Sequence, residues 1–104
     1  MIRVTVSYPN QPGSRFDLDY YFAKHMAMVD EKLRPHGLKS WTVEKGISGG
    51  APGSAARHQI QAHLNFETLE DMQKGMAAAA PSLMADIPNF TDVRADVQIY
   101  QVLK

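Results

Sequence analysis

The spacing of apolar residues changes along the chain, and this change most constrains the fold. Residues 2–8 and 58–66 alternate apolar and polar side chains, as half-buried strands do. Residues 18–33 and 69–80 instead repeat with the helical period, at ~100° per residue. Residues 38–46 and 93–100 are predicted to form two further strands. The predicted order is therefore β-α-β-β-α-β, in a single domain over residues 1–104.

Local signals place the ends of the first helix. Asp17 is a candidate N-cap, because its carboxylate can accept hydrogen bonds from the free amides of the first turn. Pro35 and Gly37 end the helix, and Gly37 suits the left-handed conformation that commonly follows a helix end. The apolar face of this helix, which is expected to meet a sheet, contains Leu18, Phe22, His25, Met26, Val29 and Leu33.

The second helix has weaker signals. Thr68 is its candidate cap, Gly75 weakens it by about 1 kcal/mol relative to Ala, and Pro81 is expected to stop or kink it. Residues 47–57 are rich in Gly, Pro, Ser and Ala and are predicted to form a loop. The segment 86–90 is predicted to be an extended link, because Pro88 disfavours helix in the residue before it.

Two βαβ halves with right-handed crossovers place both helices on one face of a four-stranded antiparallel sheet, an α+β fold of the ferredoxin-like type. Arg3 and Asp96 lie on neighbouring strands of this sheet and are expected to pair. The sheet face that the helices leave uncovered carries fewer Lys and Glu residues than a water-facing sheet usually does. A twofold copy of the chain is therefore expected to cover it, the alternative being a solvated face rich in amides. This polar face contains Thr5, Ser7, Gln59, Gln61, His63, Asn65, Gln98 and Tyr100.

Composition excludes several classes of function. Eleven Lys and Arg balance eleven Asp and Glu, so no net charge attracts nucleic acid or an anionic membrane surface. The absence of Cys excludes disulfides, thiol nucleophiles and cysteine-ligated metals. No apolar run approaches the roughly 20 residues of a membrane span, and the chain starts as a strand and not as a signal peptide. These features predict a cytoplasmic protein.

A series of short motifs runs along the chain. They are Tyr8-Pro9, Phe16-Asp17, Tyr20-Tyr21, His25-Met26, Gly37-Leu38, Phe66, and Asp86-Ile87-Pro88-Asn89-Phe90-Thr91 leading into Val97-Gln98-Ile99. In their order and spacing these motifs resemble those of the EthD family, which is named after a gene linked to ethyl tert-butyl ether degradation. The resemblance spans essentially the whole chain and implies a dimeric α/β barrel, in which ferredoxin-like protomers pair through their sheets. It also implies a place in a degradation or secondary-metabolite pathway. Relatives in the wider barrel group include cofactor-independent monooxygenases, polyketide cyclases, lactone isomerases and heme-degrading enzymes.

His25 is the candidate general acid or base. It lies on the face of the first helix turned toward the sheet, where desolvation favours a neutral imidazole that can accept or return a proton. Tyr8 and Tyr21 can place hydroxyl groups beside it, whereas Tyr20 is expected on the surface. The alternative is a core histidine that is satisfied by a backbone carbonyl or by Tyr8.

A second group of side chains can hold a small apolar or aromatic ligand. The segment 86–90 is expected to form a wall or lid of the same pocket. The alternative is that the large side chains simply fill the core, with Phe90 as a plug at its end. The predicted substrate-binding residues are Phe22, Trp41, Phe66, Asn89 and Phe90.

No metal or cofactor is predicted. His58 and His63 are five positions apart and face opposite sides of a strand, and His36 lies far from both along the chain. The Gly-rich run 46–50 precedes a strand, whereas a pyrophosphate-binding loop precedes a helix.

Three functional hypotheses follow. The first is a cofactor-independent oxidoreductase or isomerase that acts on a small aromatic or polyketide-like substrate, with His25 as acid or base. The second is a non-catalytic accessory or small-molecule-binding module of an oxygenase pathway. The third is heme binding through His25, which a hemin titration without a Soret shift would eliminate.

Overall fold

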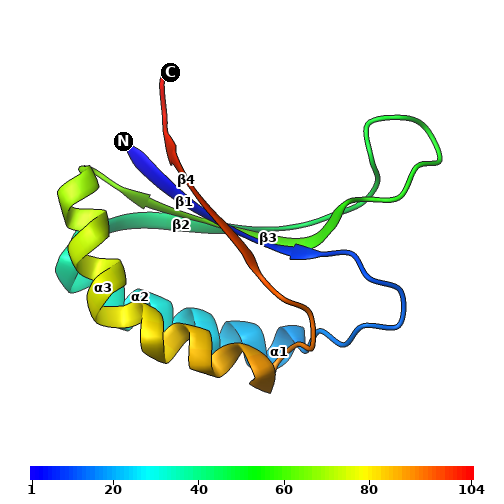
Figure 1. The fold of residues 1–104 in the computed structure, drawn as a ribbon, viewed down its shortest axis with the longest axis horizontal. Coiled ribbons are helices and arrows are strands. Elements are labelled where there is room, and N and C mark those ends of the chain that lie inside the picture. The colour runs from blue at the N-terminus through cyan, green and yellow to red at the C-terminus, as the bar shows by residue number, and fades with distance from the viewer.

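A computed structural model describes the whole chain, Met1–Lys104, and confirms the predicted α+β architecture (Figure 1). The strands are β1 (Ile2–Pro9), β2 (Leu38–Lys45), β3 (His58–Phe66) and β4 (Asp96–Gln101). The first helical rod consists of α1 (Leu18–Tyr20), the π-helix η1 (Tyr21–Met26), α2 (Ala27–Leu33) and the 3₁₀ turn η2 (Arg34–His36). The second consists of α3 (Leu69–Asp86) and the 3₁₀ turn η3 (Ile87–Asn89).

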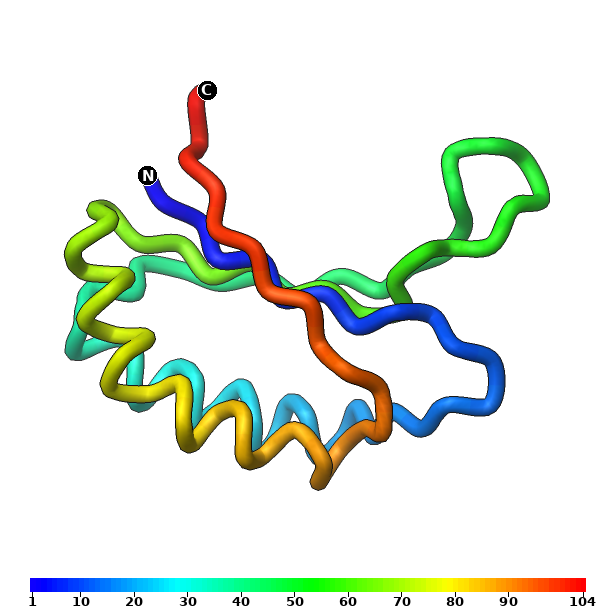
Figure 2. Tube along the Cα trace, viewed as in Figure 1, coloured from blue at the N-terminus to red at the C-terminus, as the bar shows by residue number.

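The four strands form one antiparallel sheet in the order β2-β3-β1-β4. Both helical rods lie on one face of this sheet and run side by side along it (Figure 2). The β2–β3 loop extends away from the helical layer. No helix of the structure is both long enough and apolar enough to cross a lipid bilayer.

The core lies between the sheet and the helices. Alternate residues of β1 and β3, such as Val4 and Leu64, point toward the helices and are buried against Val29 and Leu33 of the first rod. Each fully buried aliphatic side chain of this kind contributes about 1.5–3 kcal/mol. At Gly75 of α3 the two rods approach so closely that a Cβ atom would lie 3.3 Å from Leu33.

The predicted caps are confirmed. The Asp17 carboxylate accepts from the Tyr20 amide at 3.0 Å, and the Thr68 hydroxyl accepts from the Asp71 amide at 3.1 Å. Gly37 ends the first rod with φ 98°, a left-handed conformation in which a Cβ atom would approach Asp71 to 2.9 Å. These caps explain why the helices begin and turn where the sequence signals lie.

Of the two outcomes expected at Pro81, a stop or a kink, the stop is wrong. Pro81 lies inside α3, which continues to Asp86, and η3 follows where an extended link was expected. Ala79 and Leu83 are buried on either side of Pro81, so packing against the core outweighs the hydrogen bond that proline removes. Pro88 lies at the start of η3, where a missing N–H costs no helical hydrogen bond.

The inward face of the first rod also differs from the prediction at its N-terminal end. Tyr21 is buried, while Phe22 is 47% exposed and Leu18 is 37% exposed. The cause is η1, because each π turn contains one residue more than an α turn and rotates the preceding residues relative to the following ones. From His25 to Leu33 the predicted face is confirmed.

The outer face of the sheet carries hydrogen-bonded polar pairs. Thr5 contacts His63 at 2.9 Å, and the Ser7 hydroxyl donates to Gln61 at 2.7 Å. The predicted Arg3–Asp96 pair does not form. Because the register sets Asp96 opposite Ser7, Arg3 instead donates to the side-chain oxygen of Asn65 at 2.9 Å.

Candidate active site

The centre of the candidate site is a histidine–carboxylate pair. His25 comes from η1 and is 5% exposed, and its Nδ1 lies 2.9 Å from Oδ2 of Asp86. Asp86 is the last residue of α3, so the pair connects the two helical rods. The contact exists because α3 passes through Pro81 and continues to Asp86.

Asp86 is held from three sides. Its Oδ1 accepts from the Tyr20 hydroxyl at 2.6 Å and from the Asn89 amide at 3.0 Å, while Oδ2 contacts His25. Tyr20 is therefore half-buried, with its hydroxyl group on Asp86, and the prediction of a surface position for Tyr20 is wrong. The carboxylate has little freedom to turn away from the imidazole.

Burial and hydrogen bonding fix the protonation of the pair. Burial lowers the pKa of His25 below its ordinary value of 6.5, and the hydrogen bond that His25 donates to Asp86 opposes this shift only in part. For Asp86, burial acts to raise the pKa, but the hydrogen bonds from Tyr20, Asn89 and His25 outweigh it and lower the pKa. An ionised carboxylate can only accept, so Nδ1 of the neutral imidazole carries the proton and Nε2 carries the lone pair.

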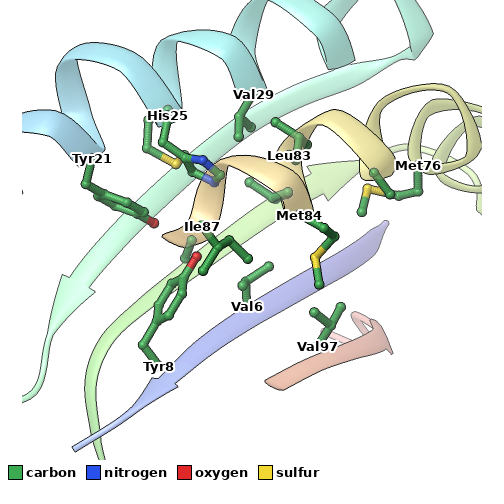
Figure 3. Close-up of a pocket in the computed structure, with 14 residues that line it drawn as sticks. Val6, Tyr8, Tyr21, His25, Val29, Met76, Leu83, Met84, Ile87 and Val97 are labelled. Atoms are coloured by element: carbon green, nitrogen blue, oxygen red, sulfur yellow. The ribbon is translucent and has the colours of Figure 1, made fainter. Parts of the chain in front are cut away.

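The hydroxyl groups of Tyr8 and Tyr21 lie on the same side of the site as the Nε2 lone pair of His25 (Figure 3). Every fully buried side-chain nitrogen or oxygen has a hydrogen-bond partner. Nε2 of His25 and the hydroxyls of Tyr8 and Tyr21 make no hydrogen bond within the chain, so each reaches open space. Figure 3 shows the two tyrosine rings extending toward the space below the His25 ring. Burial raises the pKa of both tyrosines, which keeps their hydroxyls protonated as donors.

The open space is a cavity of about 50 Å³ between the sheet and the two helical rods. Thirteen of its fourteen lining residues are hydrophobic, and His25 is the exception. It contains no Lys, Arg or free carboxylate that would favour a charged ligand. The arrangement offers one base and two neutral hydrogen-bond donors inside a hydrocarbon wall.

An aromatic cluster holds these groups in place. The Phe90 ring lies 4.7 Å from the His25 ring, 5.1 Å from Tyr21 and 5.7 Å from Tyr8, measured between centroids. The His25 and Tyr21 rings are stacked at 5.6 Å. Rotation of any of these rings would disturb its neighbours, so the polar atoms are positioned by packing.

The structure brings together only some of the predicted site residues. His25, Tyr8 and Tyr21 line the cavity, whereas none of the predicted substrate-binding residues does. Phe90 is fully buried behind the cavity wall, Asn89 contacts Asp86, and Phe22 faces outward. Phe66 and Trp41 also lie away from the cavity. Phe66 lies next to Gly75, and the indole N–H of Trp41 donates a hydrogen bond to Asp30 at 2.9 Å.

Sequence reasoning missed Asp86 and Tyr20 as functional residues. One signal for Asp86 was available. An acidic residue in the last turn of a helix opposes the helix dipole, and it is unfavourable there unless other groups stabilise its charge.

Of the segment 86–90, Ile87 lines the cavity and so forms part of its wall. The structure contains no group of three His, Asp or Glu side chains arranged to hold a metal ion.

Comparison with known proteins identifies the family. No family model and no curated protein sequence matches the chain. The crystal structure of an EthD-like protein from Ralstonia eutropha JMP134 is 33% identical, with a TM-score of 0.89, and the match covers 99% of this chain and 92% of that one. An EthD family protein from Bacillus halodurans C-125 is 17% identical, with a TM-score of 0.69 and 99% of both chains covered.

A third structure has the same fold with little sequence similarity. It is a dimeric protein of ferredoxin-like fold from Bacteroides fragilis NCTC 9343, with 8% identity, a TM-score of 0.56, and 97% and 95% of the two chains covered. The ferredoxin-like topology predicted from the element order is thus confirmed. By its similarity to the Ralstonia eutropha protein over nearly its whole length, this chain belongs to the EthD-like family.

Proposed function

We propose that this protein is a cofactor-independent acid–base catalyst, an isomerase or oxidoreductase, that acts on a small aromatic or polyketide-like substrate in the apolar cavity. The observation that carries the proposal is the His25–Asp86 pair, whose free Nε2 reaches the cavity beside the hydroxyls of Tyr8 and Tyr21. A neutral imidazole in this position can remove a proton from a phenol, an enol or a carbon next to a carbonyl group.

The groups around His25 can stabilise both products of this proton transfer. The negative charge that develops on the substrate oxygen can accept hydrogen bonds from the Tyr8 and Tyr21 hydroxyls. The imidazolium that forms at His25 is stabilised by the Asp86 carboxylate at 2.9 Å. In an isomerase the proton returns to another substrate atom. In an oxygenation the deprotonated substrate is the species that reacts with dioxygen.

The test is turnover of a panel of phenols and anthrones by the wild type and by His25→Gln. A catalyst loses about 100-fold or more in kcat with this change, since general acid–base catalysis contributes about 10²–10⁴-fold. Equal circular dichroism spectra and denaturation midpoints show that the variant folds. Turnover that is unchanged in the variant would contradict the role of His25.

A non-catalytic binding module is the second candidate, because the same two neutral donors and apolar wall suit ligand binding without a reaction. The panel separates the two candidates. Saturable binding without turnover by any member would support the binding module.

We also propose that the protein forms a homodimer through the outer face of the sheet. Thr5 and Ser7 on this face are buried by their polar neighbours, and the face presents hydrogen-bonded polar pairs to a partner. The Bacteroides fragilis protein of the same fold is dimeric, which supports a dimeric state but does not identify the face that pairs. A twofold axis would place the same polar surface of both copies together.

A further inference from the structure

The cavity is closed at its polar end and open at the opposite end. His25, Tyr8 and Tyr21 are all buried, and the other apolar lining residues are buried or half-buried with two exceptions. Only two lining residues are exposed, Met84 at 52% and Val97 at 46%. Met84 belongs to α3 and Val97 to β4, so the opening lies between these two elements.

The topology explains why the cavity opens there. β4 is an edge strand, and no helix covers its inward-facing residues Val97 and Ile99. Val97 pairs with Val6 of β1, which lines the cavity floor, so its side chain points to the same side of the sheet. In Figure 3 Met84 and Val97 approach from opposite sides, α3 above and β4 below.

We infer that ligands enter the cavity between Met84 and Val97, and that a bound substrate keeps its unreactive apolar end in this opening. The orientation of the substrate rests on the proposed function, because it assumes that the reacting group meets His25. The position of the opening does not rest on it. Met84 is a flexible thioether side chain that can adapt to ligands of different width, whereas Val97 is stiff.

The chemistry of the opening defines the substrate class further. Met84, Val97, Met76 and Ala80 surround the outer half of the cavity with uncharged side chains. A hydrocarbon extension of the substrate gains free energy there as it leaves water. A carboxylate or phosphate at the same position would lose hydration without a cationic partner. The structure therefore assigns substrates with a neutral, apolar end opposite the acidic group.

The position of the opening can be tested without any substrate. Diethyl pyrocarbonate reacts with a neutral imidazole nitrogen, forming an N–C bond with loss of ethanol and carbon dioxide, and Nε2 is the free nitrogen of His25. Mass spectrometry measures this modification rate at His25, with the exposed His36 as an internal reference. We expect Val97→Trp to slow modification of His25 by about tenfold, because the reagent must then wait for a rarer local opening.

Ile99→Trp is the matched control. Ile99 is the next inward-facing residue of β4 and is 42% exposed, but it does not line the cavity. This variant should react at the wild-type rate. Met84→Trp obstructs the opening from α3 and serves as the second obstructing variant if Val97→Trp does not fold. Wild-type rates in a folded Val97→Trp or Met84→Trp protein would overturn the inference.

The orientation of the ligand is tested with 4-alkylphenols of increasing chain length. Wild-type affinity should rise by about two- to fourfold for each methylene group that enters the opening. Val97→Asp should reduce this gain per methylene group, while Ile99→Asp should not. Affinity that is independent of chain length would refute the orientation. If no phenol binds but Val97→Trp still slows carbethoxylation, the opening is established and the proposed function fails.

Discussion

Nδ1 of His25 lies 2.9 Å from Oδ2 of Asp86, although 61 positions separate the two residues in the chain. The pair gives the candidate site a directed base, because the carboxylate fixes both the orientation of the imidazole ring and the position of its proton.

Asp86→Asn should abolish most of the proton-transfer activity. The side-chain NH₂ of asparagine can donate to Nδ1, which would move the imidazole proton to Nε2 and remove the lone pair from the cavity. We expect kcat for a phenol that the wild type converts to fall about 100-fold or more. Nitrogen NMR of His25 reports the tautomer directly, without a substrate.

Asp92→Asn is the control for this substitution. It removes the same charge from the following loop, where Asp92 accepts from the Arg15 amide and does not contact His25. Unchanged tautomer and activity in Asp86→Asn would contradict the assigned role of the carboxylate.

The stability of the protein should fall as the pH drops below 6.5. Burial lowers the pKa of His25 in the folded chain. As the pH falls, the unfolded chain therefore binds a proton at His25 at a higher pH than the folded chain does. The free energy of unfolding therefore decreases between 6.5 and the lower pKa of the folded state, by about 1.4 kcal/mol for each pH unit of that interval. Asp86 adds a second loss below 3.8, since its pKa is also lowered.

Urea denaturation at several pH values measures this effect. His25→Gln lacks the titrating group, so its stability should change less between pH 7 and pH 5 than that of the wild type. An equal pH dependence in both proteins would show that His25 is not the group responsible.

Tyr20→Phe should raise the pKa of His25. The substitution removes the 2.6 Å hydrogen bond to Asp86, so the carboxylate becomes more basic and interacts more strongly with the imidazolium. The pH–rate profile and an NMR titration of His25 should both shift toward higher pH. Tyr100→Phe is the control, because Tyr100 is 44% exposed on β4 and its hydroxyl makes no hydrogen bond. A pKa shift of the same size in both variants would show that Tyr20 has no specific effect on His25.

The order of strands and helices could be predicted from the sequence because it depends on local patterns. Alternation in residues 58–66 and the caps Asp17 and Thr68 involve neighbours in the chain, and the structure confirms them. The inward position of Tyr21 could not be predicted in the same way. It depends on the π-helix η1, in which Tyr21 packs on Phe90 from a distant segment of the chain.

The candidate site was predicted in part for the same reason. His25 and Tyr8 lie on predicted inward faces and Tyr21 precedes His25 by one helical turn, so spacing could bring them together. Asp86 joins them only because α3 continues through Pro81, against the local preference of proline. Tertiary packing of Ala79 and Leu83 decides that outcome, and no local pattern reports it.

Gln98→Arg should weaken the proposed homodimer. Gln98 pairs with Thr5 on the outer face, so an interface on this face would take the added positive charge out of water. A buried charge without a partner costs several kcal/mol, and sedimentation should show a shift from dimer to the 11.6 kDa chain. Gln101→Arg adds the same charge on the other face of β4 and should leave the dimer intact. A wild-type protein that sediments as a monomer at micromolar concentration would disprove the proposal.

Phe90→Ala tests whether this residue supports the site as core or closes it as a lid. Phe90 is fully buried, and its ring packs on five other rings, those of Tyr8, Phe16, Tyr20, Tyr21 and His25. Truncation should therefore reduce the free energy of unfolding by about 3–5 kcal/mol, as large-to-small changes in a packed core do.

Phe90→Leu separates stability from site geometry. Leucine fills most of the space, so this variant should lose less stability than Phe90→Ala. It cannot replace the ring that lies 4.7 Å from the His25 ring, so the orientation of the imidazole should loosen and kcat should fall more than phenol affinity. A lid would behave in the opposite way, with near-normal urea midpoints for both variants and a large loss of phenol affinity. That result would move Phe90 from the supporting core to the wall of the binding site.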